Sequence, residues 1–84
     1  MKYVHVGFGN WLNPERIVAI AVPQSAPILR MLRDARAKGN VVDLTAGRRT
    51  LGVVVTDTQV VLVALQPETV AARAQGRVEP DGAE

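Results

Sequence analysis

Two apolar segments that flank a short polar turn constrain the fold of this chain more than any other feature. They contain the runs Val53-Val54-Val55 and Val60–Leu65, with the polar pair Asp57-Thr58 between them. Short β-branched runs on either side of a turn predict a β-hairpin, with strands over Leu51–Thr56 and Gln59–Leu65. A hairpin that exposes one face to water alternates apolar and polar residues, and these strands do not. Both faces of the hairpin therefore have to be covered.

The size of the chain limits how that cover is supplied. A domain of 84 residues buries only about 60–65 % of its unfolded surface. Disulfides cannot add stability, because the chain has no cysteine. We expect self-association, with a partner subunit as the second layer. The alternative is that one helix covers one face of the hairpin, and a second helix with loops covers the other.

Three more strands are predicted from β-rich segments bounded by turn residues. They are Tyr3–Phe8, Glu15–Val22 and Val41–Thr45, and Asn10–Pro14 is predicted to be a loop. The strongest helical pattern follows Ser25 and ends at Gly39, a residue type that often terminates helices. Ser25 is expected to cap the helix through its hydroxyl, with Pro27 in the first turn. The apolar side of this helix is predicted to consist of Ile28, Met31, Leu32 and Ala35.

A shorter second helix is predicted from Pro67 to about Gln75, and Gly76 closes it. The element order is then ββαβββα. We therefore expect an α+β fold, a small antiparallel-sheet domain over residues 1–77. Residues 78–84 form an acidic tail that is expected to be disordered.

The most informative polar stretch is Gly47-Arg48-Arg49-Thr50, which lies between two predicted strands. Arginine forks bind phosphate oxygens bidentately and remain charged at any working pH. The formal net charge is +2, and setting aside the three carboxylates of residues 78–84 leaves +5 on residues 1–77. The commonest polyanionic partner of a basic protein is nucleic acid, although most Arg-Arg pairs in turns are simply solvated.

The residue types needed for catalysis or metal binding are scarce. The chain has no cysteine, one histidine (His5) and one serine (Ser25), and its carboxylates lack paired spacing. We expect no enzyme, no metal site and no cofactor. The N-terminal residues do not resemble a signal peptide, and the longest apolar run is far too short to span a membrane. We expect a cytoplasmic protein without a membrane partner.

Six short motifs, in one order and at close spacing, resemble the RemA family of small bacterial regulators of extracellular matrix genes. They are Gly7–Asn10, Arg16–Ile20, Ser25–Ile28, Asp34–Arg36, Gly47–Thr50 and Gln66–Val70. The resemblance covers residues 1 to about 73. It implies a DNA-binding transcriptional regulator without a helix-turn-helix, similar in fold to the β-rich LytTR domain and assembled into rings that DNA can wrap.

The resemblance also implies which residues contact DNA. The family's DNA-contacting arginines match Arg16, Arg48 and Arg49, and Pro27 matches a position in the same helix-start motif. The chain departs from the family pattern at four positions: Trp11, Pro14, Ala46 and Leu51. Compared with the family pattern, Ala46 and Leu51 remove charge near the basic tip.

The resulting hypothesis is a nucleoid-associated ring that binds duplex DNA through arginines repeated around its rim. Arg30 and Arg33, on the polar side of the first helix, are further candidates for DNA contact. Trp11 and Pro27 are expected at the subunit interface, and no small-molecule substrate is expected. The alternative is a structural or protein-interaction module whose basic rim binds an acidic partner.

Overall fold

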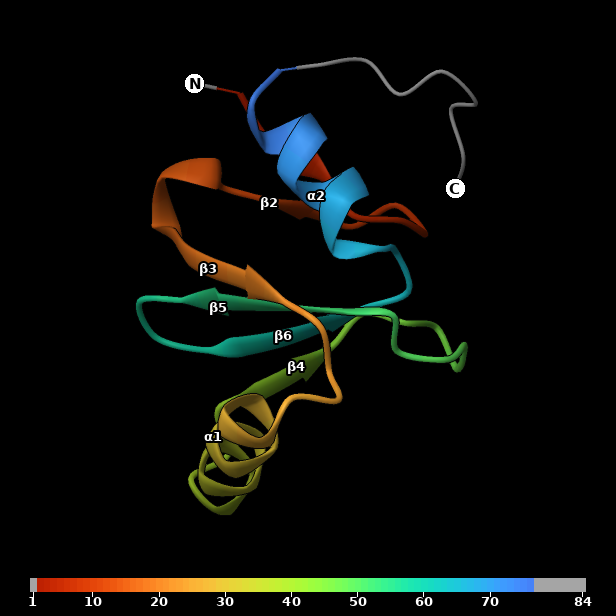
Figure 1. Cartoon of the computed structure of the whole chain (residues 1–84). Coiled ribbons are helices and arrows are strands. Elements are labelled where there is room, and N and C mark those ends of the chain that lie inside the picture. Colours follow the sequence, from red (N-terminus) through yellow and green to blue (C-terminus); the bar gives the residue numbers. More distant parts are fainter. Residues whose placement is uncertain (1, 77–84) are drawn as a thin grey trace.

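The computed structural model describes residues 2–76 and consists of two helices and two β-sheets (Figure 1). The acidic tail predicted for residues 78–84 lies outside the described residues. Two strands, β1 (Val4–His5) and β2 (Trp11–Leu12), form a small sheet. The larger sheet contains four strands, and two helices complete the fold. These elements are β3 (Ile17–Ala21), β4 (Val41–Asp43), β5 (Gly52–Thr56), β6 (Val60–Val63), α1 (Ala26–Ala37) and α2 (Pro67–Ala74).

The larger sheet is mixed, which corrects the expectation of an antiparallel one. Its strand order is β3-β5-β6-β4, and β4 pairs with β6 in parallel whereas the other pairs are antiparallel. The chain leaves β3 at one edge, passes through α1 and re-enters as β4 at the other edge. A helical crossover of this kind joins parallel strands, and the β5–β6 hairpin fills the space between them.

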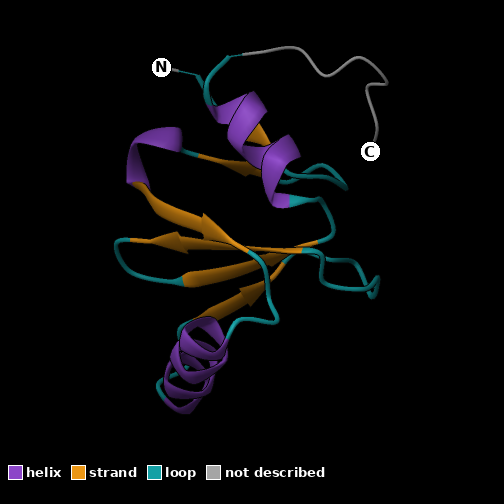
Figure 2. Ribbon diagram, in the orientation of Figure 1, coloured by secondary structure: helices purple, strands orange, loops and turns teal. Residues whose placement is uncertain are grey.

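Both faces of the β5–β6 hairpin are covered within this one chain. On one face, α1 packs against the hairpin. The buried residues of this cluster are Ile28, Leu32, Ala35, Val53, Val60 and Leu62. On the opposite face, α2 and the N-terminal residues pack against the hairpin. The buried residues of this cluster are Val4, Val6, Val54, Val61, Val63 and Val70. Figure 2 shows α1 on one side of the sheet and α2 with the small sheet on the other. The alternative, in which the chain's own helices cover the two faces of the hairpin, is therefore confirmed, and the expected partner subunit is not needed as the second layer.

The N-terminal region also differs from the prediction. The segment Asn10–Pro14, predicted as a loop, contains β2, which pairs antiparallel with a first strand shorter than expected. The turn between them has three consecutive residues with positive φ: Gly7 (+99°), Phe8 (+56°) and Gly9 (+77°). Because positive φ is tolerated mainly by glycine, the two glycines allow this tight reversal. The observed order therefore has one strand more than ββαβββα.

The start of the predicted second strand is also different. A short 3-10 helix, η1 (Pro14–Arg16), precedes β3. Asn13 caps it, because its side-chain oxygen accepts a hydrogen bond of 3.0 Å from the Glu15 N–H. Arg16 is therefore the last residue of a capped turn, and not part of the strand.

The helix α1 begins and ends close to the predicted residues. Ser25 is the N-cap residue, but its hydroxyl makes no capping hydrogen bond, so that part of the prediction is wrong. Its backbone carbonyl does accept the Leu29 N–H at 2.9 Å. Ile28, Leu32 and Ala35 are buried as predicted, whereas Met31 is 39 % exposed. Met31 thus lies at the margin of the apolar stripe.

Candidate nucleic acid interface

The loop between β4 and β5 carries Arg48 and Arg49, and its conformation is fixed by a buried threonine. Thr45 is 2 % exposed, and its hydroxyl and its backbone N–H both donate to Asp43 Oδ1, at 2.6 and 2.9 Å. The Thr45 carbonyl in turn accepts the Arg48 N–H at 2.9 Å. Ala46 and Gly47, between them, have positive φ values of +54° and +80°. The two arginines are therefore presented by a hydrogen-bonded turn.

These hydrogen bonds also stabilise the charge at the base of the loop. The Thr45 hydroxyl, followed by the Thr45 backbone N–H, lowers the pKa of Asp43 below its usual value, and the nearby Arg36 contributes in the same direction. Hydrogen bonds to a carboxylate favour its ionised form. Asp43 is therefore ionised at neutral pH and keeps accepting both bonds.

The side chains of Arg48 and Arg49 are exposed at the tip. Within residues 2–76, neither guanidinium makes a hydrogen bond or an ion pair, so both charges are uncompensated. The Arg48 guanidinium carbon lies 5.5 Å from the centroid of the Phe8 ring, a distance typical of a cation–π contact. This contact links the basic loop to the β1–β2 turn.

A pocket of about 690 Å³ opens beside this contact. Its lining is mostly apolar and consists of Gly7, Phe8, Arg48, Arg49, Leu51, Ala64 and Leu65. Leu51 contributes to the apolar lining of this pocket, at a position where the family that the sequence resembles often has a basic residue. The two guanidinium groups are thus the only charged groups that line this pocket among the described residues.

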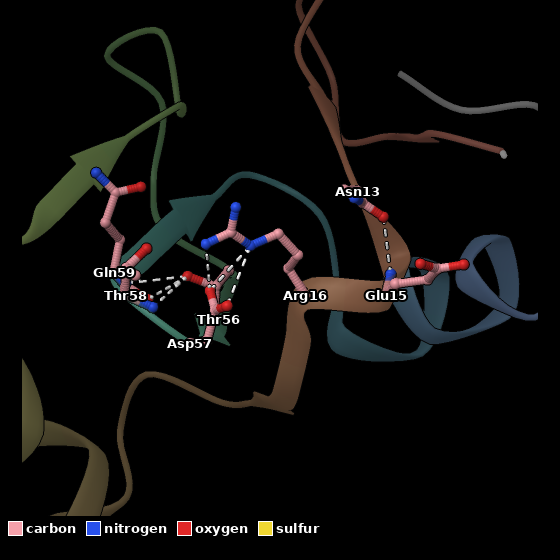
Figure 3. Close-up of polar contacts among 7 residues, drawn as sticks. All are labelled: Asn13, Glu15, Arg16, Thr56, Asp57, Thr58 and Gln59. Atoms are coloured by element: carbon pink, nitrogen blue, oxygen red, sulfur yellow. Dashed lines mark hydrogen bonds and ion pairs between the residues drawn. The ribbon is translucent and has the colours of Figure 1, made fainter.

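Arg16 lies in a different environment, paired with Asp57 in the β5–β6 turn (Figure 3). Its Nε donates to both carboxylate oxygens at 3.1 Å, and its Nη2 lies 3.0 Å from Oδ1. The Asp57 backbone N–H also donates to the Arg16 carbonyl at 3.2 Å. Both side chains are about half exposed, so the pair is accessible to a ligand.

Arg16 and the Arg48–Arg49 loop are not brought together within one subunit. Arg16 pairs next to the last residue of β5, whereas the two arginines of the loop precede its first residue. Five residues of extended strand separate the two places by at least about 15 Å. In Figure 1 the loop lies at one end of the sheet and the β5–β6 turn at the other.

The other predicted site residues occupy separate places. Arg30 and Arg33 are exposed on α1, and Pro27 is exposed in its first turn. Trp11 lies on β2 and not in a loop; it is 60 % exposed, and its ring packs 4.6 Å from that of His5. The roles of these side chains in DNA contact or assembly stay predictions.

The sequence does not reveal two partners of the arginines. The sequence pattern explains Asp57 only as a turn former. In the structure Asp57 also accepts hydrogen bonds from Arg16, which lies 41 residues away in sequence. Phe8 carries no signal of a functional contact, and it packs against Arg48. Neither pairing has a local sequence signal. By contrast, Asp43 followed two residues later by Thr45 is a recognisable pattern for a side-chain-stabilised turn.

Two other classes of site find no support within residues 2–76. These residues contain no group of three or more His, Cys, Asp or Glu side chains arranged to hold a metal ion. Neither of the two described helices is long and apolar enough to cross a membrane.

Comparison with known proteins identifies the family. The model of the RemA-like family, described as extracellular matrix regulatory protein A-like, matches residues 3–74. A protein of Geobacillus thermodenitrificans is 51 % identical over 77 residues, a match that covers 90 % of this chain and 88 % of that protein. A protein of Symbiobacterium thermophilum is 53 % identical over 78 residues, covering 92 % and 82 %. One from Clostridium botulinum is 46 % identical over 82 residues, covering 96 % and 90 %.

All three relatives carry the description "putative regulatory protein". The family match spans every predicted site residue, from Trp11 to Arg49. The resemblance drawn from six short motifs is confirmed, and the chain belongs to the RemA-like family.

Proposed function

We propose that this protein is a DNA-binding transcriptional regulator that acts as a ring of identical subunits. The observation that carries the proposal is the exposed Arg48–Arg49 pair, which no carboxylate neutralises among the described residues and which a buried threonine holds in place. A loop fixed before binding loses little conformational entropy when it meets a phosphate backbone. The regulatory descriptions of the relatives agree with this role.

The separation of the arginines supports assembly. One subunit offers Arg48 and Arg49 at one end of β5 and Arg16 at the other. In a head-to-tail ring, the end that carries Arg16 faces the neighbour's end that carries the loop. Each subunit boundary then presents three arginines to one stretch of DNA. Repetition around the ring makes later contacts intramolecular and raises the affinity by avidity.

Target choice in this mode comes from the shape of the DNA. Contacts from a few arginines per subunit are mainly contacts to phosphates, which position the duplex without reading bases. Wrapping a ring bends the duplex, so easily deformed sequences bind more tightly than stiff ones. Arg48 and Arg49 are also able to enter a narrow minor groove. We therefore expect preference for deformable duplexes over a strict base sequence.

The experiment that tests this function is an electrophoretic mobility shift with the double variant Arg48→Ala, Arg49→Ala. We expect loss of DNA retardation with an unchanged circular dichroism spectrum, because both side chains are exposed. The matched control is Lys2→Ala, Lys38→Ala, which removes two charges from exposed positions outside the loop. The control should retain most of the affinity.

Three results would contradict the proposal. Equal weakening by the two double variants would mean that only net charge matters. Unchanged DNA binding by the Arg48–Arg49 variant would place the interface elsewhere. If the wild-type protein fails to retard duplex DNA at moderate salt, an acidic protein partner becomes the better explanation of the basic loop.

A further inference from the structure

The ion pair between Arg16 and Asp57 bears directly on how Arg16 would meet DNA. Asp57 uses the Nε and Nη2 side of the guanidinium, through contacts of 3.0–3.1 Å. An arginine side chain has five N–H donors in a rigid planar fork. Asp57 therefore leaves the two Nη1 donors and one Nη2 donor for another acceptor. In Figure 3 the third nitrogen of the guanidinium points away from Asp57.

The backbone on both sides of this pair is held. Arg16 ends the capped turn η1, and its carbonyl accepts the Asp57 N–H at 3.2 Å. On the other side, the Thr56 hydroxyl donates to the Gln59 carbonyl at 3.0 Å and accepts the Gln59 N–H at 3.0 Å. The carboxylate of Asp57 is thus presented by a structured turn, and it fixes the direction of an otherwise flexible side chain.

We propose that Asp57 is a positioning residue, which holds the Arg16 guanidinium side-on so that its remaining edge receives a DNA phosphate. This inference rests on the proposed DNA-binding function and adds an acidic residue to it. The remaining edge is suited to a phosphate because an arginine fork binds two oxygens of one phosphate at once. Pre-orientation reduces the rotamer freedom that Arg16 loses on binding.

The proposal and simple electrostatics predict opposite changes in DNA affinity when the charge of Asp57 is removed. Removing a carboxylate from a surface that faces DNA should strengthen binding, because it removes a repulsion. Removing the residue that orients Arg16 should weaken binding instead. The variant Asp57→Asn therefore separates the two explanations by the direction of the change in affinity.

The matched control is Glu15→Gln, which removes the same charge one residue from Arg16. Glu15 is exposed, and it contributes its backbone N–H to the capping of this turn. In fluorescence anisotropy with a duplex that the wild type binds, we expect Glu15→Gln to bind equally or more tightly. We expect Asp57→Asn to bind about three- to tenfold more weakly, a smaller loss than that of removing a base-reading arginine, because Arg16 keeps its charge. Asp57→Glu, which keeps the charge, should recover part of the affinity.

The salt dependence provides a readout that a purely structural role would not change. Each arginine–phosphate contact contributes about 0.9 to the slope of log affinity against log salt. Asp57→Asn and Arg16→Ala should both lower the magnitude of this slope, and Glu15→Gln should leave it unchanged. Tighter binding by Asp57→Asn, at the level of Glu15→Gln, would overturn the proposal and leave DNA binding intact.

A second measurement is independent of DNA. In ¹⁵N–¹H NMR spectra of the deuterated, DNA-free protein, the Arg16 Nε–H should exchange slowly in the wild type and in Glu15→Gln. It should exchange rapidly in Asp57→Asn. Equal exchange rates in Asp57→Asn and the wild type would refute the positioning role even if the wild type fails to bind DNA. Failure of DNA binding with this pattern of exchange rates would refute the proposed function and the phosphate contact, and would leave only the positioning of Arg16 by Asp57 supported.

Discussion

At the scale of single residues, Thr45 controls the geometry of the basic loop. It is the only polar residue among the buried side chains of the described chain, and both of its donors serve Asp43. A buried hydroxyl needs a partner because burial without a hydrogen bond is costly. Asp43 supplies that partner, and the Thr45 carbonyl then binds the Arg48 N–H. A single buried side chain thus connects the core to the proposed DNA-facing tip.

Replacing Thr45 by valine tests this connection. Valine preserves the volume and removes the hydroxyl donor, so the pKa of Asp43 should rise toward its ordinary value of 3.8. NMR titration of the Asp43 carboxyl measures this shift directly. The loop should also loosen, and we expect weaker DNA binding at neutral pH. A valine variant with an unchanged pKa and unchanged DNA affinity would show that the hydroxyl does not fix the loop.

The same variant changes the response of stability to pH. A carboxyl whose pKa is lower in the folded protein stabilises the fold above its unfolded pKa, near 3.8, and this contribution disappears as the pH falls through the folded pKa. The wild type should therefore lose more stability between pH 7 and pH 3 than Thr45→Val does. Urea unfolding at the two pH values measures the difference. A larger loss in the variant would reverse the sign and contradict the assignment.

The residues of the candidate site differ in how far the sequence predicts them. Arg48 and Arg49 are recognisable because glycine and two strands surround them, and the observed loop lies where they predict it. The partnership of Arg16 with Asp57 depends on the pairing of β3 with β5. Long-range pairing is set by the whole sheet, so no local pattern contains it. The same holds for the contact of Phe8 with Arg48.

At the scale of elements, the sequence predicts what is locally encoded. The β5–β6 hairpin and both helices lie close to the predicted residues, because their turn, proline and glycine signals are local. The parallel pairing of β4 has no local signal, because the direction of this strand depends on the path of the chain through α1. The strand β2 cannot be predicted locally, because it has only two residues and they follow a glycine-rich turn.

Gly52, the first residue of β5, is required by close packing and not by its backbone conformation. A Cβ at this position would lie 2.6 Å from the Leu65 carbonyl oxygen and 3.2 Å from a methyl carbon of Val63. Backbone cannot yield as a flexible side chain does, so the strand end and the start of α2 would have to separate. We expect Gly52→Ala to lower the free energy of unfolding by about 1–3 kcal/mol, measured by urea denaturation.

A second glycine serves as the control for this prediction. Gly39 has a φ of +73°, and a Cβ added there would meet open space, with nothing within 4 Å beyond its chain neighbours. Asparagine tolerates this left-handed conformation, so Gly39→Asn should cost less than Gly52→Ala. If Gly52→Ala is as stable as the wild type, the close contact beside Gly52 relaxes without cost, and its packing role is refuted.

At the scale of the whole molecule, the argument for assembly rests on exposed apolar side chains and not on an uncovered hairpin. The β5–β6 hairpin is covered on both faces by the chain's own elements, so it needs no partner subunit. Seven large apolar side chains are nevertheless exposed among the described residues: Tyr3, Phe8, Trp11, Val18, Val22, Leu29 and Met31. Single exposed apolar residues are ordinary, but so many on a chain of 84 residues favour contact with another surface.

Val18 is the most exposed of these side chains, at 69 %, and it lies on the edge strand β3. The pairing of β3 with β5 shifts register between Ile17 and Ala19, so Val18 stands outside the regular ladder. Such a bulge works against the addition of another strand. In the proposed ring we therefore expect a neighbouring subunit to contact the side chain of Val18 and not to extend the sheet. This position is also two residues from Arg16, at the end of the subunit that the proposed ring brings to its neighbour.

The variant Val18→Lys tests the whole assembly. A charge at an apolar contact should separate the subunits, and light scattering should then give a mass near the 9.0 kDa of one chain. Because the side chain is exposed, the folded spectrum should persist. DNA affinity should fall more than about tenfold, since each subunit would bind without avidity. Gln24→Lys, which adds the same charge at another exposed position, should leave mass and affinity unchanged. A full-size assembly of Val18→Lys would place the interface at other exposed apolar residues, such as Trp11 or Leu29, and a monomeric wild type would refute the ring itself.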